Sequence, residues 1–417
     1  MTTSPRGVPR LPEVSGRSGV SLGRSALGVG LGLAAAGITA AAGMAADRLS
    51  RDRRTAVALD AGVADPRYHE TPDSELVVTA TDGVELHVEI DEPRREANDD
   101  GNDDAATRPT VVLSHGYCLN LTSWVFQRRA LREAGYRVVL WDQRGHGLSG
   151  MGDRESISIE QLGDDLYRVV EEVVPEGPIV LVGHSMGGMS MMALALEHED
   201  FVKKRVVGAA FVATSPGNLS GVSYGLGRLG GHLVRRLTPW TSSVLAPRQN
   251  LVDRGLRQAR DVVDFFVDFG SFGSPVPLSI AQLTTDMIFG TRMEVISAFF
   301  PLFDQHDKRE ALAAFDGVET LVISGTADRL TPPEHSEEIV RLIPGAEHVL
   351  VEDAGHVIML EHPEILDEYL LELVARSCRA GDGRRPVRVR RQVKDVAGRR
   401  AARRARRPKE NRDAASA

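Results

Sequence analysis

Short apolar runs alternate with segments of helical periodicity along much of the chain. Runs of about four to eight apolar residues are typical of buried strands, and apolar residues spaced by three and four are typical of helices. The predicted buried strands lie at residues 109–116, 136–142, 178–182, 206–214, 319–328 and 346–356. The predicted helices lie at residues 123–134, 159–174, 189–196, 334–342 and 364–376. This alternation predicts an α/β fold with a doubly wound, mostly parallel sheet.

Residues 74–92 have the period of two that is typical of an exposed strand pair. Between Val84 and Ile90 every second residue is apolar, and Asp82-Gly83 is a turn signal between two such stretches. We expect an antiparallel hairpin ahead of the parallel strands.

The alternation stops after Pro216. Residues 217–312 have no strand pattern and favour short helices joined by Gly and Pro turns, which predicts a helical cap inserted into a core of residues 74–216 and 313–378. Most of the phenylalanines fall in the cap or just after it, and they either form its small core or line an apolar pocket. Those phenylalanines are Phe265, Phe266, Phe269, Phe272, Phe289, Phe299, Phe300, Phe303 and Phe315. His306 and Asp307 are expected at the cap surface or its hinge.

The N-terminal part differs from the core in composition. Residues 1–24 are rich in Ser, Gly, Pro and Arg and predict a disordered basic leader, and residues 47–73 predict a linker. Residues 25–46 carry no charge and would span about 33 Å as a helix, which predicts a single-pass membrane anchor. A cleaved signal peptide or a soluble Ala-rich helix are the alternatives, and they would make the protein secreted or cytoplasmic.

The C-terminal part is strongly basic. In residues 379–417 the 15 arginines and lysines outnumber the four acids by 11, so the formal charge of −8 leaves −19 on the other residues. A disordered Arg-rich tail is expected, and contact with anionic lipid is the alternative. Nucleic acid is not an expected partner, because no aromatic residues alternate with the arginines.

Neither a metal nor a cofactor is expected. The two cysteines, Cys118 and Cys378, form no C-x-x-C pair, and neither a P-loop nor a G-x-G-x-x-G after a first strand occurs.

The strongest chemical motif is G-x-S-x-G at Gly183, His184, Ser185, Met186 and Gly187. It stands between a predicted strand and a predicted helix, where a sharp turn would expose the serine hydroxyl above the sheet edge. In a parallel sheet the strand C-termini gather at one edge, so side chains that follow other strands can reach this serine. Asp328 ends one late strand and His356 follows the next.

The order Ser185, Asp328, His356 and five short motifs resemble the α/β-hydrolase family of the lipase and esterase type, with a helical cap. The motifs are HGY at 115–117, DQRGHGLS at 142–149, GHSMGG at 183–188, GTADRLTP at 325–332 and AGHVIMLEHP at 354–363. The cap stretches FGSPVP and FDQHDK and the Ala-rich N-terminal run look most similar to hydrolases of actinobacteria.

The resemblance implies an acyl-transfer mechanism. Ser185 would attack a carbonyl, His356 would move the proton, and Asp328 would orient the imidazole. The backbone N–H groups of Tyr117 and Met186 would hold the oxyanion. His115 and His184 are expected to orient loops, and Asp142 to fix the Gly-rich loop.

The expected activity is hydrolysis of a small-molecule ester or lipid, similar to monoacylglycerol lipases and carboxylesterases. Ser185 argues against epoxide hydrolases and haloalkane dehalogenases, whose nucleophile is an aspartate. Amide or thioester cleavage and cofactor-free perhydrolysis by the same triad are alternatives. A membrane-tethered binding module would have a disabled triad, which this sequence does not show.

Overall fold

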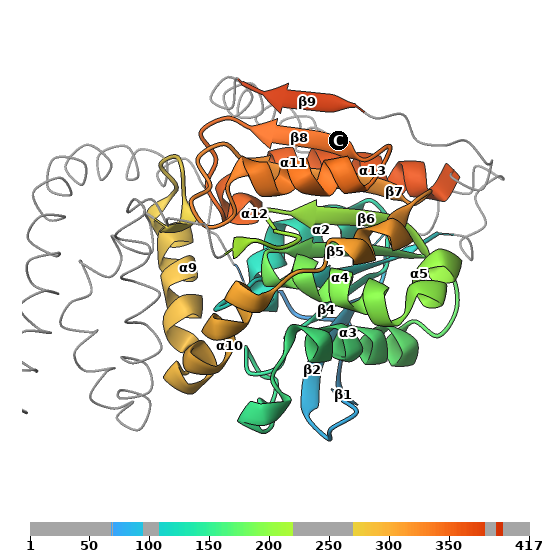
Figure 1. Ribbon diagram of the computed structural model, residues 1–417, viewed down its shortest axis with the longest axis vertical. Coiled ribbons are helices and arrows are strands. Elements are labelled where there is room, and N and C mark those ends of the chain that lie inside the picture. The colour runs from blue at the N-terminus through green and yellow to red at the C-terminus, as the bar shows by residue number, and fades with distance from the viewer. Residues whose placement is uncertain (1–67, 69, 95–107, 220–269, 380–388, 395–417) are drawn as a thin grey trace, which may run out of the picture. The chain divides into compact units, whose positions relative to one another are not determined.

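The computed structural model describes residues 68, 70–94, 108–219, 270–379 and 389–394 (Figure 1). These residues form one sheet with the strand order β1-β2-β4-β3-β5-β6-β7-β8-β9. The strands are β1 Ser74–Thr79, β2 Glu85–Asp91, β3 Thr110–Ser114, β4 Val138–Trp141, β5 Ile179–His184, β6 Val206–Val212, β7 Glu319–Gly325, β8 Glu347–Val351 and β9 Arg390–Val393. Strand β2 pairs antiparallel with β1 and β4, and all other pairs are parallel. The predicted hairpin and mostly parallel sheet are confirmed.

Helices cover both faces of the sheet. On the core, α2 Val125–Glu133 and α13 Pro363–Arg379 pack against one face, and α3 Ile159–Val173, α4 Met186–Glu197 and α11 Pro333–Leu342 pack against the other. The remaining short elements there are η2 Leu121–Trp124, η3 Arg154–Ser156, α5 Glu199–Arg205, η6 Glu310–Phe315 and α12 Ile358–Glu361.

Helix α3 shows why these segments become covering helices. Its side chains Leu162, Leu166, Val169 and Val170 recur at intervals of three and four, and all four are fully buried. Each such burial stabilises the fold by about 1.5–3 kcal/mol. Ser158 accepts the Gln161 N–H at 3.0 Å and so caps the first turn of the helix.

Two helices of the predicted cap are described, α9 Leu278–Gly290 and α10 Met293–Gln305. They lie beyond the sheet edge toward which β6 and β8 point (Figure 1). Residues 220–269, which make up much of the predicted cap, lie outside the described residues.

The two stretches at the ends of the predicted cap, residues 215–217 and 306–308, contact each other. Gly217 forms a β-bridge with Asp307, and the Lys308 N–H donates to the Pro216 carbonyl at 2.8 Å. His306 Nε2 donates to the Ser215 carbonyl at 3.0 Å. Of the two places expected for His306, the cap surface or its hinge, the contacts show the hinge, and the residue is only 4% exposed. Burial lowers the pKa of His306 to about 4.

The expectation of a disordered tail over residues 379–417 is wrong for the part that the structure describes. Residues 390–393 form β9, which pairs with β8. Val393 is buried, and Arg391 forms ion pairs with Glu347 at 2.9 Å and Glu372 at 3.1 Å. The alternation of apolar and basic residues therefore suits an edge strand on an acidic body.

The predicted membrane anchor, residues 25–46, lies outside the described residues. Among the residues that are described, no helix has the length and apolar character needed to cross a bilayer.

Candidate active site

Ser185 occupies the sharp turn between β5 and α4. Its backbone has φ 50° and ψ −114°, a left-handed region that costs an L-residue about 1–3 kcal/mol. Two hydrogen bonds hold this conformation: the Ser185 N–H donates to Val212 O at 3.0 Å, and Thr214 Oγ1 donates to Ser185 O at 2.6 Å. The neighbouring strand β6 therefore fixes the turn.

Glycines around the turn let three backbone segments come together. A Cβ atom at Gly187 would lie 2.2 Å from the Ser114 carbonyl oxygen, and one at Gly183 would lie 2.5 Å from Gly187. A Cβ atom at Gly116 would lie 2.5 Å from His184 Nδ1 and 3.3 Å from Ser185 Cβ. The loop after β3 is therefore packed directly against the serine turn.

Asp328 and His356 come together at the same edge of the sheet. Asp328 follows β7, His356 follows β8, and His356 Nδ1 lies 2.9 Å from Asp328 Oδ2. Both side chains are buried, and the His356 ring centroid is 4.8 Å from that of His184. We infer that Nδ1 carries the proton shared with the carboxylate, which leaves Nε2 as an acceptor.

Among the described residues, no hydrogen bond joins the Ser185 hydroxyl to His356, whose side-chain partners are Asp328 and Thr331. Such contacts are often long in free enzymes and shorten when substrate binds. Ser185 is half-buried, whereas Asp328 and His356 are almost completely shielded from water.

Thr331 is a member of this group that the sequence did not reveal. Its Oγ1 donates to Asp328 Oδ2 at 2.8 Å and lies 3.3 Å from His356 Nδ1. Asp328 Oδ1 accepts the N–H groups of Leu330 at 2.8 Å and Thr331 at 2.9 Å. Contacts within its own loop thus hold the Asp328 carboxylate in place, independently of its hydrogen bond with His356.

The two histidines expected to orient loops do contact loop backbone. His184 Nε2 donates to the His356 carbonyl at 3.0 Å, and His115 Nε2 accepts the Gln143 N–H at 2.9 Å. Burial holds the pKa of His184 well below its usual value. Burial also lowers the pKa of His115. Both rings are therefore neutral at pH 7.

The expected oxyanion donors are the backbone N–H groups of Tyr117 and Met186. Met186 is the first residue of α4, whose leading N–H groups have no partner within the helix. Tyr117 follows Gly116, whose contact with the serine turn is described above. The Tyr117 hydroxyl donates to the Ile296 carbonyl of α10 at 2.9 Å, and burial raises its pKa well above 10. This side chain ties the loop after β3 to the cap.

The Gly-rich loop of residues 142–149 is held by its acid, as expected. Asp142 accepts the N–H groups of Leu121 and Leu148, each at 2.9 Å, and lies 3.2 Å from His87 Nδ1. Burial raises the pKa of Asp142, but these contacts outweigh it and the pKa is lowered.

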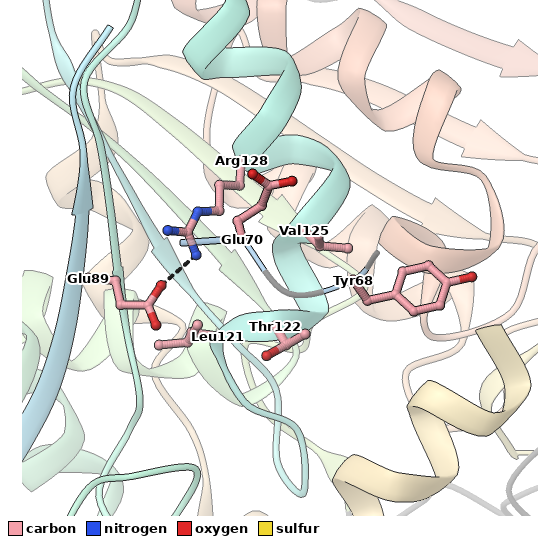
Figure 2. Close-up of a pocket in the computed structure, with 7 residues that line it drawn as sticks. All are labelled: Tyr68, Glu70, Glu89, Leu121, Thr122, Val125 and Arg128. Atoms are coloured by element: carbon pink, nitrogen blue, oxygen red, sulfur yellow. Dashed lines mark hydrogen bonds and ion pairs between the residues drawn. The ribbon is translucent and has the colours of Figure 1, made fainter. Parts of the chain in front are cut away.

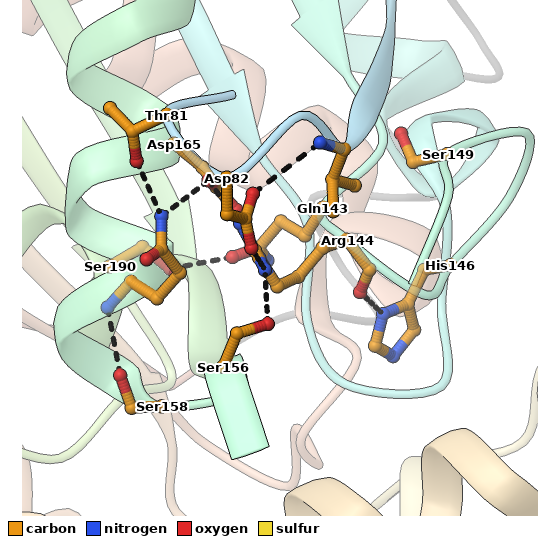
Figure 3. Close-up of polar contacts among 12 residues, drawn as sticks. Thr81, Asp82, Gln143, Arg144, His146, Ser149, Ser156, Ser158, Asp165 and Ser190 are labelled. Atoms are coloured by element: carbon orange, nitrogen blue, oxygen red, sulfur yellow. Dashed lines mark hydrogen bonds and ion pairs between the residues drawn. The ribbon is translucent and has the colours of Figure 1, made fainter. Parts of the chain in front are cut away.

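Arg144 anchors the same loop from the other side (Figure 3). The guanidinium is fully buried and forms a bidentate pair with Asp165 of α3, at 2.6 and 2.7 Å. It also pairs with Asp82 of the hairpin turn at 2.8 Å. Gly145, the next residue, faces the cap, since a Cβ there would lie 3.1 Å from Val295 of α10.

Apolar side chains of α10 pack beside the serine turn. Met186 and Phe299 belong to one buried cluster, against which Tyr117, Leu302 and Phe303 are packed while partly exposed. The Tyr117 and Phe303 ring centroids are 5.1 Å apart. The region next to the candidate oxyanion donors is therefore apolar and aromatic.

A small pocket lies away from these residues, beside η2 and α2 (Figure 2). It is lined by Tyr68, Glu70, Glu89, Leu121, Thr122, Val125 and Arg128. Its volume of about 30 Å³ suits a water molecule or two rather than an acyl chain, and Arg128 is paired with Glu89. In the described ranges, no group of three or more His, Cys, Asp or Glu side chains is placed to hold a metal ion.

A strained serine at a strand–helix turn, with an Asp–His pair after the last two core strands, defines an α/β-hydrolase. The chain belongs to the serine aminopeptidase S33 family, whose model matches residues 105–363. The resemblance to α/β-hydrolases is confirmed, and the protein is a hydrolase.

Known proteins of several activities are similar to this chain. An AB hydrolase superfamily protein of Bacillus subtilis is 25% identical, over 70% of this chain and 95% of its own length. An sn-1-specific diacylglycerol lipase of Mus musculus is 28% identical, over 63% of this chain and 80% of its own length. The structure of an esterase from Exiguobacterium antarcticum superposes with a TM-score of 0.56 at 20% identity, covering 72% of this chain and all of that chain, and so shows the same fold.

Proposed function

We propose that the protein cleaves carboxylic esters with an apolar acyl group, through an acyl-enzyme on Ser185. The observation that carries the proposal is the strained Ser185 turn beside the hydrogen-bonded pair of His356 and Asp328. A serine hydroxyl needs a neighbouring base to act as a nucleophile, and the base needs a partner that fixes its tautomer.

In the proposed reaction, Ser185 Oγ attacks the ester carbonyl carbon while its proton moves to His356 Nε2. The N–H groups of Tyr117 and Met186 donate to the resulting oxyanion, and each such donor is worth about 3–4 kcal/mol. The tetrahedral intermediate collapses, and the alcohol leaves with the proton from Nε2. Water then attacks the acyl carbon and gives a proton to Nε2. The second tetrahedral intermediate breaks its bond to Ser185 Oγ and releases the acid, while the Nε2 proton returns to Oγ.

The surroundings of the turn support an apolar substrate. Leu302 and Phe303 of α10 are partly exposed next to Tyr117 and Met186. An acyl chain that bound there would leave water, and this transfer is favourable. The diacylglycerol lipase and the esterase named above are hydrolases of esters, which supports the same reaction here.

Amide cleavage is the second candidate, because the family is described as serine aminopeptidases. A panel of p-nitrophenyl acyl esters and amino-acid anilides separates the two reactions. We expect kcat/KM to be higher for the esters and to rise with acyl length. A higher value for the anilides would favour the aminopeptidase reaction.

The nucleophile is tested by a fluorophosphonate probe and by Ser185→Ala. We expect the probe to label Ser185 in the folded protein, and Ser185→Ala to lower kcat by at least about 10⁴-fold. Ser377→Ala, which removes a buried hydroxyl of α13, is the control and should label like the unchanged protein. Labelling at another residue, or turnover that survives Ser185→Ala, would refute the assignment.

We also propose that residues 25–46 attach the protein to a membrane. The support is the uncharged stretch of the sequence, which is long enough as a helix to cross a bilayer. Fractionation of the full chain with carbonate washing tests it, and recovery in the soluble fraction would exclude an integral anchor.

A further inference from the structure

A buried carboxylate lies next to the His356 loop. Glu361 ends α12 and is 1% exposed. One of its oxygens accepts the Ser274 N–H and the Ser274 hydroxyl, both at 2.6 Å, and the other accepts the Gly355 N–H at 2.6 Å. The Gly273 N–H is 3.1 Å from the first oxygen. His362 Nε2 lies 3.5 Å from the same oxygen.

These donors come from two segments that are far apart in the sequence. Gly355 precedes His356, whereas Gly273 and Ser274 belong to the segment of residues 270–274 that leads into cap helix α9. A buried carboxylate is stabilised by the donors it collects. Glu361 therefore ties the His356 loop to the cap segment.

The backbone of the two segments is also in direct contact. The Val357 N–H donates to the Ser271 carbonyl at 2.9 Å. A Cβ atom at Gly355 would lie 2.5 Å from the Gly273 nitrogen, so there is no space for a side chain between them. The residues on both sides of His356 are thus held by Glu361 or by the cap segment.

A third backbone contact of this loop comes from the serine turn. His184 Nε2 donates to the carbonyl of His356 itself. The loop backbone from 355 to 357 is consequently fixed at three successive residues. Two of the three contacts depend on the cap segment or on the carboxylate that binds it.

We propose that Glu361 is a positioning residue for His356, and that the cap segment 270–274 completes the support of this base. The proposal rests on the proposed function, in which His356 moves the proton. Glu361 contacts neither the imidazole nor the reacting atoms, and it acts by setting the position of the Gly355 N–H. A displacement of about 1 Å at a catalytic group can lower a rate about 100-fold.

The first test is Glu361→Gln in the full-length protein. The amide nitrogen of Gln would face an N–H donor at one of the two oxygen positions, so one segment must move. We expect kcat for p-nitrophenyl butyrate to fall about 10–100-fold with KM changed less than about threefold. Asp91→Asn, which disturbs the buried pair of Asp91, the last residue of β2, with Arg128 of α2, is the matched control. It should lower thermal stability but keep kcat per folded molecule within about twofold of the unchanged protein.

A second readout needs no substrate. The proton between His356 Nδ1 and Asp328 should give a low-field proton NMR signal, assigned by its absence in His356→Gln. We expect Glu361→Gln to shift or broaden this signal and Asp91→Asn to leave it unchanged. If the unchanged protein has no ester turnover and no fluorophosphonate adduct on Ser185, the proposed function fails, whereas the NMR comparison still tests the positioning.

A milder variant tests the cap side if Glu361→Gln folds poorly. Ser274→Ala removes the hydroxyl donor but keeps the N–H, so we expect kcat to fall about two- to fivefold. In the Glu361→Gln background it should have little further effect, because the two residues share one contact. Independent effects of the two changes, or full activity of folded Glu361→Gln with an unchanged NMR signal, would overturn the proposal.

Discussion

At the scale of the single residue, Ser185 carries backbone strain that suits the role proposed for it as a nucleophile. Its φ of 50° is unfavourable for any residue with a Cβ atom and acceptable for glycine. We predict that Ser185→Gly is more stable to urea than Ser185→Ala by about 1 kcal/mol, and that both are inactive. A Gly variant less stable than the Ala variant would show that the turn is not strained.

His306 gives a prediction about pH. Its pKa is about 4 in the folded protein, because the ring is buried, against 6.5 for an exposed histidine. The unfolded chain therefore binds a proton between pH 6.5 and 4 that the folded chain does not, and stability is lost as the pH falls through this window.

His306→Gln removes this proton and keeps a side-chain N–H for the Ser215 carbonyl. We predict that the free energy of unfolding then falls less steeply between pH 6 and pH 4.5, by about 1.4 kcal/mol per pH unit. Urea titrations of the two proteins at several pH values measure the slopes, and equal slopes would contradict the prediction.

Single residues differ in how far the sequence reveals them. The positions of Ser185, Asp328 and His356 could be predicted, because each follows a strand of a parallel sheet and the strand ends share one edge. Thr331 and Glu361 could not, since their contacts depend on the path of a loop rather than on the end of a strand. Both lie in stretches that resemble the family, but no spacing rule marks them.

At the scale of the element, Pro301 explains how the cap helix α10 is fastened to the core. Proline has no N–H, so the Ser297 carbonyl four residues earlier loses its partner within the helix. Arg154 of η3 donates to that carbonyl at 3.0 Å and to the Ser297 hydroxyl at 3.1 Å. The Ser297 carbonyl, which has no partner within α10, thus accepts a hydrogen bond from Arg154 of the core.

We predict that Arg154→Ala lowers the free energy of unfolding by about 1 kcal/mol, because a largely buried carbonyl loses its donor. In a Pro301→Ala background the helix supplies its own N–H, and the loss on removing Arg154 should be smaller. A double-mutant cycle by urea denaturation measures the difference. Equal losses in the two backgrounds would show that Pro301 does not create the contact.

Elements also differ in how far they can be predicted. The buried strands and amphipathic helices were found because their periodicity continues over several residues. Helices α5 and α12 were not, since each is too short to show a period. Strand β9 lies in an arginine-rich stretch whose composition predicts a disordered tail, although Val393 is buried beside β8.

At the scale of the whole molecule, part of the basic tail binds the acidic body of its own chain. Arg390 pairs with Glu337 at 3.2 Å, in addition to the pairs of Arg391 with Glu347 and Glu372. Some of the positive charge of the C-terminal part is therefore paired with negative charge of the same chain.

We predict that a chain ending at residue 388 melts about 3–6 °C lower than the full chain, because β9 contributes the buried Val393 and the edge hydrogen bonds of β8. A chain ending at residue 394 keeps β9 and should melt like the full chain. Differential scanning calorimetry of the three proteins measures this. Equal melting of the chain ending at 388 would mean that β9 adds no stability.

Strands β6 and β7 are neighbours in the sheet although residues 213–318 lie between them in the sequence. Loop-closure entropy grows only with the logarithm of length, so doubling such an insertion costs about 0.6 kcal/mol. The free energy of pairing β6 with β7 therefore depends only weakly on the number of residues inserted between them. The Gly217–Asp307 bridge holds the two ends of the insertion together. Replacing the residues between them with a segment of another length should therefore change the stability of the sheet only slightly.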